Sequence, residues 1–342
     1  MSYSDNINDR GAVAIFSASV KSRSLKRLIL RESSIQSSGW VKSFKVMVDS
    51  EFTLEELFLE NNVIDDIGAA LLFEVLGSHK SLIALNMQMS ESISSAGWVA
   101  CFRLLLHSGF TLKKLCLDWN NIDDEGVAFF VELLASNKTI NVLTLGGNNH
   151  ISIDGWYRFA DILHPTSLST LKELTMGNCW QPSTEVDELV LYIAEMLKIN
   201  TKLEVFGLLG YGKLSPICWN ALSKALCDDS SIVNVCLSNH TLQVMENDKE
   251  VRDIIGDIKL PRSLRSLLKM NQKANKGDVV RDKIVTFSLI DDTRVGAAFA
   301  DASTTIMPSV IGSIGKDRLG SRQCFTSFEV CPGWSTPMSN RY

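Results

Sequence analysis

The segment from Gly207 to Leu214, GLLGYGKL, comes close to a phosphate-binding loop. In such a loop, G-x-x-x-x-G-K-[ST], backbone amides and the lysine hold the phosphates of a nucleotide, and the last hydroxyl contacts magnesium. Here Leu214 stands at the hydroxyl position, although Ser215 follows one residue later. The strand and helix on either side belong to the repeat described below, so they add no support. We therefore expect no nucleotide or other cofactor, and an unchanged ATP affinity of Lys213→Ala would exclude this site.

The histidines and cysteines lack the spacing of a metal centre or of a catalytic nucleophile. The five histidines form no H-E-x-x-H motif, and the eight cysteines form no C-x-x-C pair. No G-x-S-x-G motif marks a nucleophilic serine. These residues predict no metal site and no catalytic residues, so we expect a protein that is not an enzyme and whose thiols are reduced.

The overall charge and the distribution of apolar residues exclude several classes of protein. The net charge of −5 is opposite to what binding of nucleic acid phosphates requires. No stretch approaches 18 consecutive apolar residues, and the first residues do not resemble a signal peptide. We expect a cytoplasmic protein that binds neither nucleic acid nor membranes.

A leucine pattern recurs along the first two thirds of the chain and decides the fold. The motif (S/T)-L-x-x-L-x-L first appears as SLKRLIL from Ser24, and its copies follow at steps of 28 to 32 residues. The first apolar positions of the copies are Leu25, Leu54, Leu82, Leu112, Ile140, Leu171, Leu203 and Ile232. This motif and period are typical of leucine-rich repeats, in which each unit contains one strand and one helix.

Two kinds of unit alternate within this repeat. Gly-Trp pairs recur every 58 residues at Trp40, Trp98 and Trp156, and the units between them contain Asp65-Asp66 and Asp123-Asp124. This alternation resembles the ribonuclease-inhibitor class of leucine-rich repeats. The resemblance implies an α/β solenoid shaped like a horseshoe, with parallel strands on the concave face and helices on the convex face. The regular spacing of the tryptophans predicts a role in the core.

Other residues of each unit have predictable structural roles. Asn62 and Asn120 follow the strand, where a buried amide can bond the backbone of the turn. Asp65-Asp66 and Asp123-Asp124 precede a helix, where carboxylates bond free N–H groups. Since a single unit cannot bury its own apolar face, the units must stack.

Three parts of the chain are predicted. Residues 1–240 form the solenoid, with a partial first unit and about eight further units; the partial unit is either a cap or a piece of a longer protein. Residues 241–287 form a helical C-terminal cap, with Leu264, Leu267 and Leu268 on the apolar side of one helix, although a basic partner-binding helix is the alternative. Residues 288–342 form an irregular tail.

The concave face is the predicted binding surface. Because side chains alternate along a strand, inward leucines place the residues between them on the concave face. The N-terminal half of this face is charged and carries two aromatic residues. We expect the partner to contact Arg27, Arg31, Glu56, Phe58, Glu60, Asn86, Lys114, Asp118 and Trp119.

The predicted function is that of a protein–protein interaction scaffold. This follows from analogy with the fold and from the lack of a catalytic motif. Two alternatives stay open. One is a regulator of a small GTPase, since Ran GTPase-activating proteins use similar repeats, although they tend to carry an acidic tail that this chain lacks. The other is a ligand-sensing fragment of a larger immune-type receptor.

Overall fold

Strands and helices alternate along the chain. The computed structural model describes residues 7–167, 169–177, 183–208, 214–245, 260–284 and 286. The strands are β1 (Arg27–Ile29), β2 (Glu56–Phe58), β3 (Ala84–Asn86), β4 (Lys114–Cys116), β5 (Val142–Thr144), β6 (Glu173–Met176), β7 (Val205–Leu208) and β8 (Val244–Met245). The helices are α1 (Asp9–Lys21), α2 (Ser37–Val48), α3 (Asp66–Ser78), α4 (Ser95–Leu106), α5 (Asp124–Ser136), α6 (Ile153–Ala160), the short 3-10 helix η1 (Asp161–Leu163), α7 (Thr184–Ile199), α8 (Pro216–Leu226), α9 (Ile232–Leu237), α11 (Arg262–Asn271) and α12 (Lys276–Lys283).

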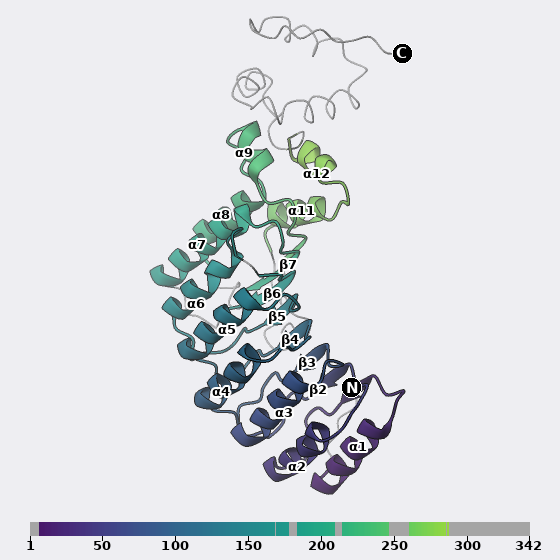
Figure 1. Ribbon diagram of the computed structural model, residues 1–342. Helices are drawn as coiled ribbons and strands as arrows, with labels where there is room; N and C mark the ends of the chain where they lie inside the picture. The colour runs from purple at the N-terminus through teal and green to yellow at the C-terminus, as the bar shows by residue number, and fades with distance from the viewer. Residues whose placement is uncertain are drawn as a thin grey trace, which may run out of the picture.

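The eight strands of the described residues lie parallel in one sheet, and their order in the sheet is their order in the sequence. The register pairs Leu28 with Leu57, Leu57 with Leu85, and Leu85 with Leu115. Parallel neighbours need a crossover connection, which one helix per coil supplies. Figure 1 shows the strands along the inner side of a curve and the helices along its outer side. The predicted α/β solenoid is confirmed.

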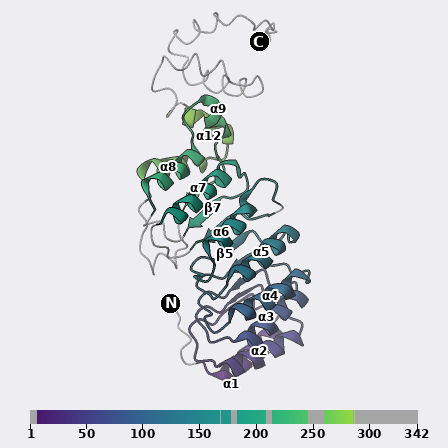
Figure 2. The same cartoon turned by 90° about the vertical axis from the view of Figure 1, so that its left-hand side faces the viewer.

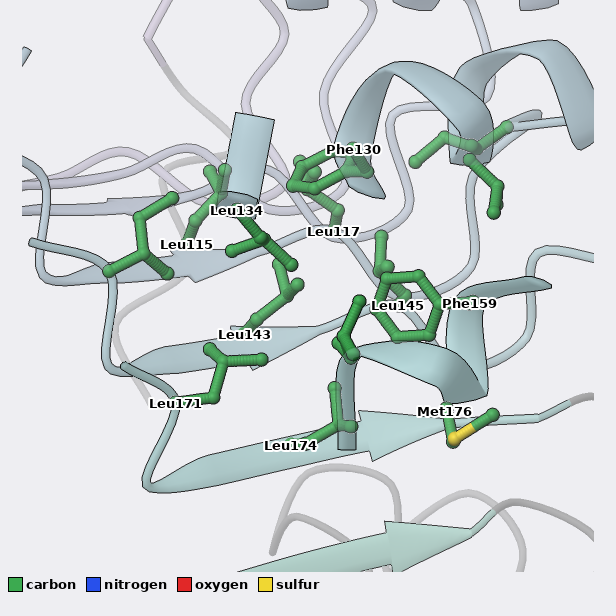
Figure 3. Close-up of a cluster of buried hydrophobic side chains, with 14 of the residues drawn as sticks. Leu115, Leu117, Phe130, Leu134, Leu143, Leu145, Phe159, Leu171, Leu174 and Met176 are labelled. Atoms are coloured by element: carbon green, nitrogen blue, oxygen red, sulfur yellow. The ribbon is translucent and has the colours of Figure 1, made fainter. Parts of the chain in front are cut away.

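The repeated leucines face a continuous core between the sheet and the helices. Figure 3 shows Leu117 beside Phe130 and Leu145 beside Phe159, with Leu115 and Leu143 in the same cluster, and all six are fully buried. Complete burial of one such side chain contributes about 1.5–3 kcal/mol. The buried residues of all the coils belong to one continuous cluster, so the coils are stable as a stack.

The recurring tryptophans lie in this core, as predicted. Trp40, Trp98 and Trp156 are fully buried. Trp40 stacks on Phe44 of its own helix with 5.5 Å between ring centroids, and Phe16 of the preceding helix meets it edge-on at 6.2 Å. Trp98 makes the same two kinds of contact one period later. These aromatic pairs connect successive helices.

The asparagines after the strands bond the backbone of two coils. Asn120 donates from Nδ2 to the carbonyls of Met87 and Leu117, at 2.9 and 3.0 Å, and its Oδ1 accepts the amide of Ser90 at 2.8 Å. Asn62 makes the equivalent bonds one coil pair earlier. Both side chains are buried, so the prediction for these asparagines is confirmed.

The aspartates before the helices act as N-caps. Asp65 accepts the backbone amide of Gly68 at 2.9 Å, and Asp123 accepts that of Gly126 at 3.0 Å. The bonds satisfy N–H groups that have no partner within the helix. This prediction is also confirmed.

The eighth strand does not lie where the motif predicted it. The run from Ser231, SIVNVCL, contains helix α9, and β8 follows it to pair with β7. Periodicity cannot separate a strand from a helix in so short an apolar run. Ser231 favours the helix, because its hydroxyl accepts the backbone amide of Asn234 at 3.0 Å. The predicted strand at Ser231 was wrong, and the sheet extends to Met245.

Helices α11 and α12 lie at the C-terminal end of the stack. Leu264, Leu267 and Leu268 of α11 are buried in the common core, as the pattern predicts. The fully buried Lys283 of α12 donates hydrogen bonds to the carbonyl of Asn239 and to Nδ1 of His240. The boundaries at residues 240 and 287 stay predictions, and residues 288–342 lie outside the described part of the chain.

Candidate functional site

Side chains on the inner side of the curve form rows across the strands. The register places Ile29 beside Phe58, and Phe58 beside Asn86. A second row, two residues further along each strand, consists of Arg31, Glu60, Gln88 and Asp118. The two rows contain most of the residues that the sequence assigns to partner binding.

Arg27, Ile29, Arg31 and Phe58 form what we call the arginine–phenylalanine cluster. The guanidinium carbons of Arg27 and Arg31 lie 5.4 and 5.6 Å from the centroid of the Phe58 ring, within the range of cation–π contacts. Arg27 is also paired with Glu56, whose hydrogen bond raises the pKa of the guanidinium. Ile29 is 41% exposed. The cluster therefore presents apolar and cationic groups together.

Next to the cluster, polar side chains bond to one another across four coils. We call the second row, together with Asn86 of the first row, the polar ladder: Arg31, Glu60, Asn86, Gln88 and Asp118. Arg31 pairs with Glu60 at 2.6 Å, and Asn86 donates to the same carboxylate oxygen. Gln88 donates to Asp118, which also accepts the backbone amide of Gly146 at 2.7 Å. Hydrogen bonds to charged groups are stronger than those between neutral groups. The ladder therefore holds the side chains of the inner surface in one arrangement.

Three residues predicted to contact a partner are buried within the ladder. Glu60 is 7% exposed, Asn86 5% and Asp118 0%. They lie on the inner face, as alternation along the strand predicts, but side chains of adjacent coils pack over them and bond them. The prediction that they are exposed was wrong. The exposed or half-buried residues of the predicted set are Arg27, Arg31, Glu56, Phe58, Lys114 and Trp119.

A left-handed backbone conformation recurs just after the ladder row. The residues concerned are Glu32, Asn61, Met89 and Trp119, with φ of 46°, 54°, 55° and 58°, and then Gly147 and Gly177, with φ of 76° and 95°. Residues other than glycine and asparagine rarely adopt this backbone conformation. Its recurrence at one position after strands β1 to β6 shows that the turn imposes it, whatever the residue.

Trp119 lies against Gly147 of the next coil. A Cβ on Gly147 would stand 2.6 Å from the indole ring, so glycine allows the ring to pack there. The two residues border a shallow hollow of about 120 Å³, together with Glu91, Asn120, Asn121, Asn149 and His150. The hollow is smaller than the sites that hold cofactors, and it is large enough for one side chain of a partner.

The His, Cys, Asp and Glu side chains of the described residues do not assemble a metal centre. Among them, no three His, Cys, Asp or Glu side chains lie close enough to hold a metal ion. Burial raises the pKa of Cys101 to about 12 and that of Cys227 to about 11, so these thiols stay protonated at neutral pH. In the loop from Gly207, residues 209–213 lie outside the described ranges.

No helix in the described ranges combines the length and the apolar character required to cross a bilayer.

Known proteins contain the same repeat. Residues 110–131 match a family model described as a leucine-rich repeat. These residues include strand β4 and the first part of α5, one coil of the stack. This match and the order of the strands and helices show that the coils are leucine-rich repeats.

This leucine-rich-repeat chain is 30% identical over 142 residues to NACHT, LRR and PYD domains-containing protein 9C of Mus musculus. The match covers 41% of the chain and 14% of that much longer protein.

Solved structures with some similarity include leiomodin-1 actin-binding site 2, at 20% identity and a TM-score of 0.33, covering 39% of this chain and 75% of that one. The yeast Rad7–Elc1 complex is similar at 17% identity and a TM-score of 0.41, covering 73% of this chain and 63% of that one.

Proposed function

We propose that this protein binds another protein through the N-terminal part of its inner face. The observation that carries the proposal is the position of Arg27 and Arg31 against the half-buried ring of Phe58. Aromatic and arginine side chains supply much of the binding energy of protein interfaces. Pairing with Glu56 and Glu60 already holds both arginines, so binding costs them little further conformational entropy.

The cluster also indicates the chemistry of the partner. Phe58 and Ile29 offer an apolar contact, and the guanidinium groups beside them offer N–H donors in a planar fork. A partner surface with an apolar side chain between carboxylates would satisfy both. We expect such binding to weaken as salt is added, because exposed charge pairs are screened.

Quantitative affinity capture from cell extract tests this proposal. Relative to the unchanged chain, Phe58→Ala should recover about tenfold less partner, the loss expected for one interface anchor. Glu173→Ala is the matched control, because Glu173 is exposed on the same sheet but lies in β6, five strands away from β1. This variant should leave recovery unchanged. Circular dichroism of both variants would verify folding. Full recovery by the double variant Phe58→Ala/Trp119→Ala would remove the proposal.

The repeat class, location and lack of catalysis are part of the same proposal. The alternation of Trp-bearing and Asp-bearing coils supports the ribonuclease-inhibitor-like class. The cysteines of the described residues are free thiols, which supports a cytoplasmic location. A binding role without catalysis agrees with an inner face made of ion pairs and apolar contacts.

The match to the mouse protein favours a second candidate function. By its name, that relative combines the repeat with NACHT and PYD domains. This chain could act as the recognition segment of such a multidomain receptor. Sequencing the transcript upstream of Met1 tests the idea: a coding region for a further domain supports it, and an in-frame stop codon just before Met1 excludes it.

A further inference from the structure

Trp119 occupies the left-handed turn after β4 at a cost that the fold does not require. Its φ is 58°, and bulky residues rarely adopt this conformation. Its Nε1 is buried and has no hydrogen-bond partner in the described part of the chain. Glycine holds the same place in the next two coils, at Gly147 and Gly177, and would avoid both costs. Strained residues of this kind cluster at binding sites.

The half-buried indole ring of Trp119 forms one wall of the hollow of about 120 Å³ beside Gly147. A Cβ on Gly147 would lie 2.6 Å from Cδ2, 2.8 Å from Cε3 and 3.0 Å from Cε2 of the ring, so the glycine lies against the flat of the ring. The hollow is bordered by the turns after β3, β4 and β5. Figure 1 and Figure 2 both show β5 near the middle of the described stack, so the hollow lies away from its ends.

Hydrogen-bond acceptors line much of the rest of the hollow. Glu91 is exposed, and no ion pair joins its carboxylate to a lysine or arginine of the described residues. Asn121 donates from Nδ2 to the carbonyls of Glu91 and Ile93, at 2.8 and 3.1 Å, which leaves its Oδ1 as an acceptor. Asn149 is exposed and adds a second amide, and the imidazole of His150 lies beside it in the lining. The hollow therefore combines a carboxylate, amide oxygens and an indole ring.

The backbone around the hollow is fixed by hydrogen bonds to neighbouring coils. The amide of Ser90, next to Glu91, donates to Oδ1 of Asn120 at 2.8 Å. The amide of Trp119 donates to the carbonyl of Gly146, also at 2.8 Å. These bonds hold the segment with the carboxylate and the turn with the indole in place before anything binds. A site that is preorganised in this way loses little conformational entropy on binding.

The chemistry of this lining matches an arginine side chain. A guanidinium group is planar and stacks on an aromatic ring, and its N–H groups need carboxylate or carbonyl acceptors. The charge of Glu91 disfavours an anionic group in the hollow. A purely apolar side chain would leave the amides of Asn121 and Asn149 without partners. A lysine ammonium group has the right charge but no flat face to place on the indole.

We infer that the hollow beside Trp119 binds an arginine side chain of the partner protein. The guanidinium lies against the indole ring and donates hydrogen bonds to the carboxylate of Glu91 and to the amide oxygens. This inference rests on the proposed function, because the same partner reaches both sites. The arginine–phenylalanine cluster at β1 and β2 presents cations, whereas the hollow after β4 takes one. The two sites together therefore set the direction in which the partner lies along the inner face.

An NMR titration of the isotope-labelled full chain with N-acetyl-arginine amide tests this inference. The indole N–H resonance of Trp119 is identified by its loss in Trp119→Phe. We expect this resonance to shift saturably, with a Kd on the order of millimolar, and to shift little with the uncharged analogue N-acetyl-citrulline amide. Glu91→Gln should raise the Kd about three- to fivefold, the effect of losing one exposed ion pair. Glu173→Gln, which removes an exposed carboxylate outside the hollow, is the matched control and should leave the Kd unchanged.

Three results would overturn the inference: no response of the Trp119 resonance to the arginine derivative, equal binding of the citrulline derivative, or equal effects of Glu91→Gln and Glu173→Gln. Failure of the proposed function gives a different result. Phe58→Ala would then leave partner recovery unchanged while the arginine derivative still binds at the hollow. Loss of recovery in Phe58→Ala without any response at Trp119 would remove the hollow alone.

Discussion

Asp124 holds the N-cap residue of the next coil's helix: its carboxylate accepts the backbone amide and the hydroxyl of Ser152, at 2.8 and 2.6 Å, and Ser152 in turn caps α6. Asp66 holds Ser94 in the same way, at 2.7 and 2.6 Å. A Cβ on Gly155 would stand 2.1 Å from Oδ1 of Asp124. The aspartate of one coil therefore requires the glycine of the next, which explains why the two kinds of coil alternate.

This contact gives a prediction for a double-mutant cycle. Gly155→Ala should lower the free energy of unfolding by about 2 kcal/mol, because the new methyl group collides with the carboxylate. Asp124→Ala alone should cost about 1 kcal/mol through the loss of the two hydrogen bonds from Ser152. The double variant should lose less stability than the two single variants added together, because Asp124→Ala removes the carboxylate with which the new methyl group collides. Urea denaturation measures all three values, and strict additivity would show that the residues do not interact.

A second prediction concerns the buried asparagines. Asn120→Ala should reduce the free energy of unfolding by about 3 kcal/mol, because two carbonyls and one amide lose their partner inside the core. Asn149→Ala is the control, because Asn149 is exposed and should change stability by less than about 0.5 kcal/mol. Similar costs for the two variants in urea denaturation would argue against the role of Asn120.

The contact between Gly147 and Trp119 gives a third prediction. Gly147→Ala should cost about 2 kcal/mol, from the collision with the indole ring and from the left-handed backbone. In a chain that also carries Trp119→Ala, Gly147→Ala should cost only about 1 kcal/mol. The collision with the indole ring is then absent, and only the backbone strain is left. Thermal and urea unfolding of the four proteins would check this. An undiminished cost in that background would mean that the ring does not lie on the glycine.

A fourth prediction links the C-terminal end of the stack to pH. Burial lowers the pKa of Lys283 to about 7 from an ordinary value of 10.5, with Lys276 nearby as a like charge. Between these two values the unfolded chain holds a proton that the folded chain lacks. Lowering the pH through this window should therefore destabilise the fold, by at most about 1.4 kcal/mol per pH unit.

Lys283→Met isolates this effect. The wild-type chain should gain stability relative to the variant between about pH 7 and about pH 10, the window that the two pKa values define. Urea unfolding of both proteins across that range measures the difference, in which other titrating groups cancel. A difference that does not vary with pH would show that the amine is not buried.

The sequence predicted the parts of the structure that depend on contacts within one coil. Leu57 and Trp98 recur at fixed steps because each coil must bury the same positions, so spacing alone indicates burial. The burial of Glu60 and Asp118 depends on side chains 26 to 30 residues away, in coils whose distance is set by the curvature. The residue pattern within one coil carries no information about the distance between coils.

Other parts were missed for the same kind of reason. The apolar run from Ser231 fits both a strand and a helix, and the choice depends on a capping bond and on the neighbouring coil. Gly147 is one of several glycines in the sequence, and its importance appears only when Trp119 is seen above it. A signal was present in both cases: Thr241-Leu242 offers a competing strand motif, and Gly147 follows Trp119 by one repeat length.

The left-handed residues after strands β1 to β4 have a consequence for how such a protein can diversify. The turn fixes the backbone at Glu32, Asn61, Met89 and Trp119, while the side chains of Glu32 and Asn61 are exposed and those of Met89 and Trp119 are half-buried. An acidic, an amide, a thioether and an indole group already occupy equivalent places. Evolution can therefore exchange chemical groups at this row of positions, and so alter what the molecule touches, without rebuilding the framework that holds them.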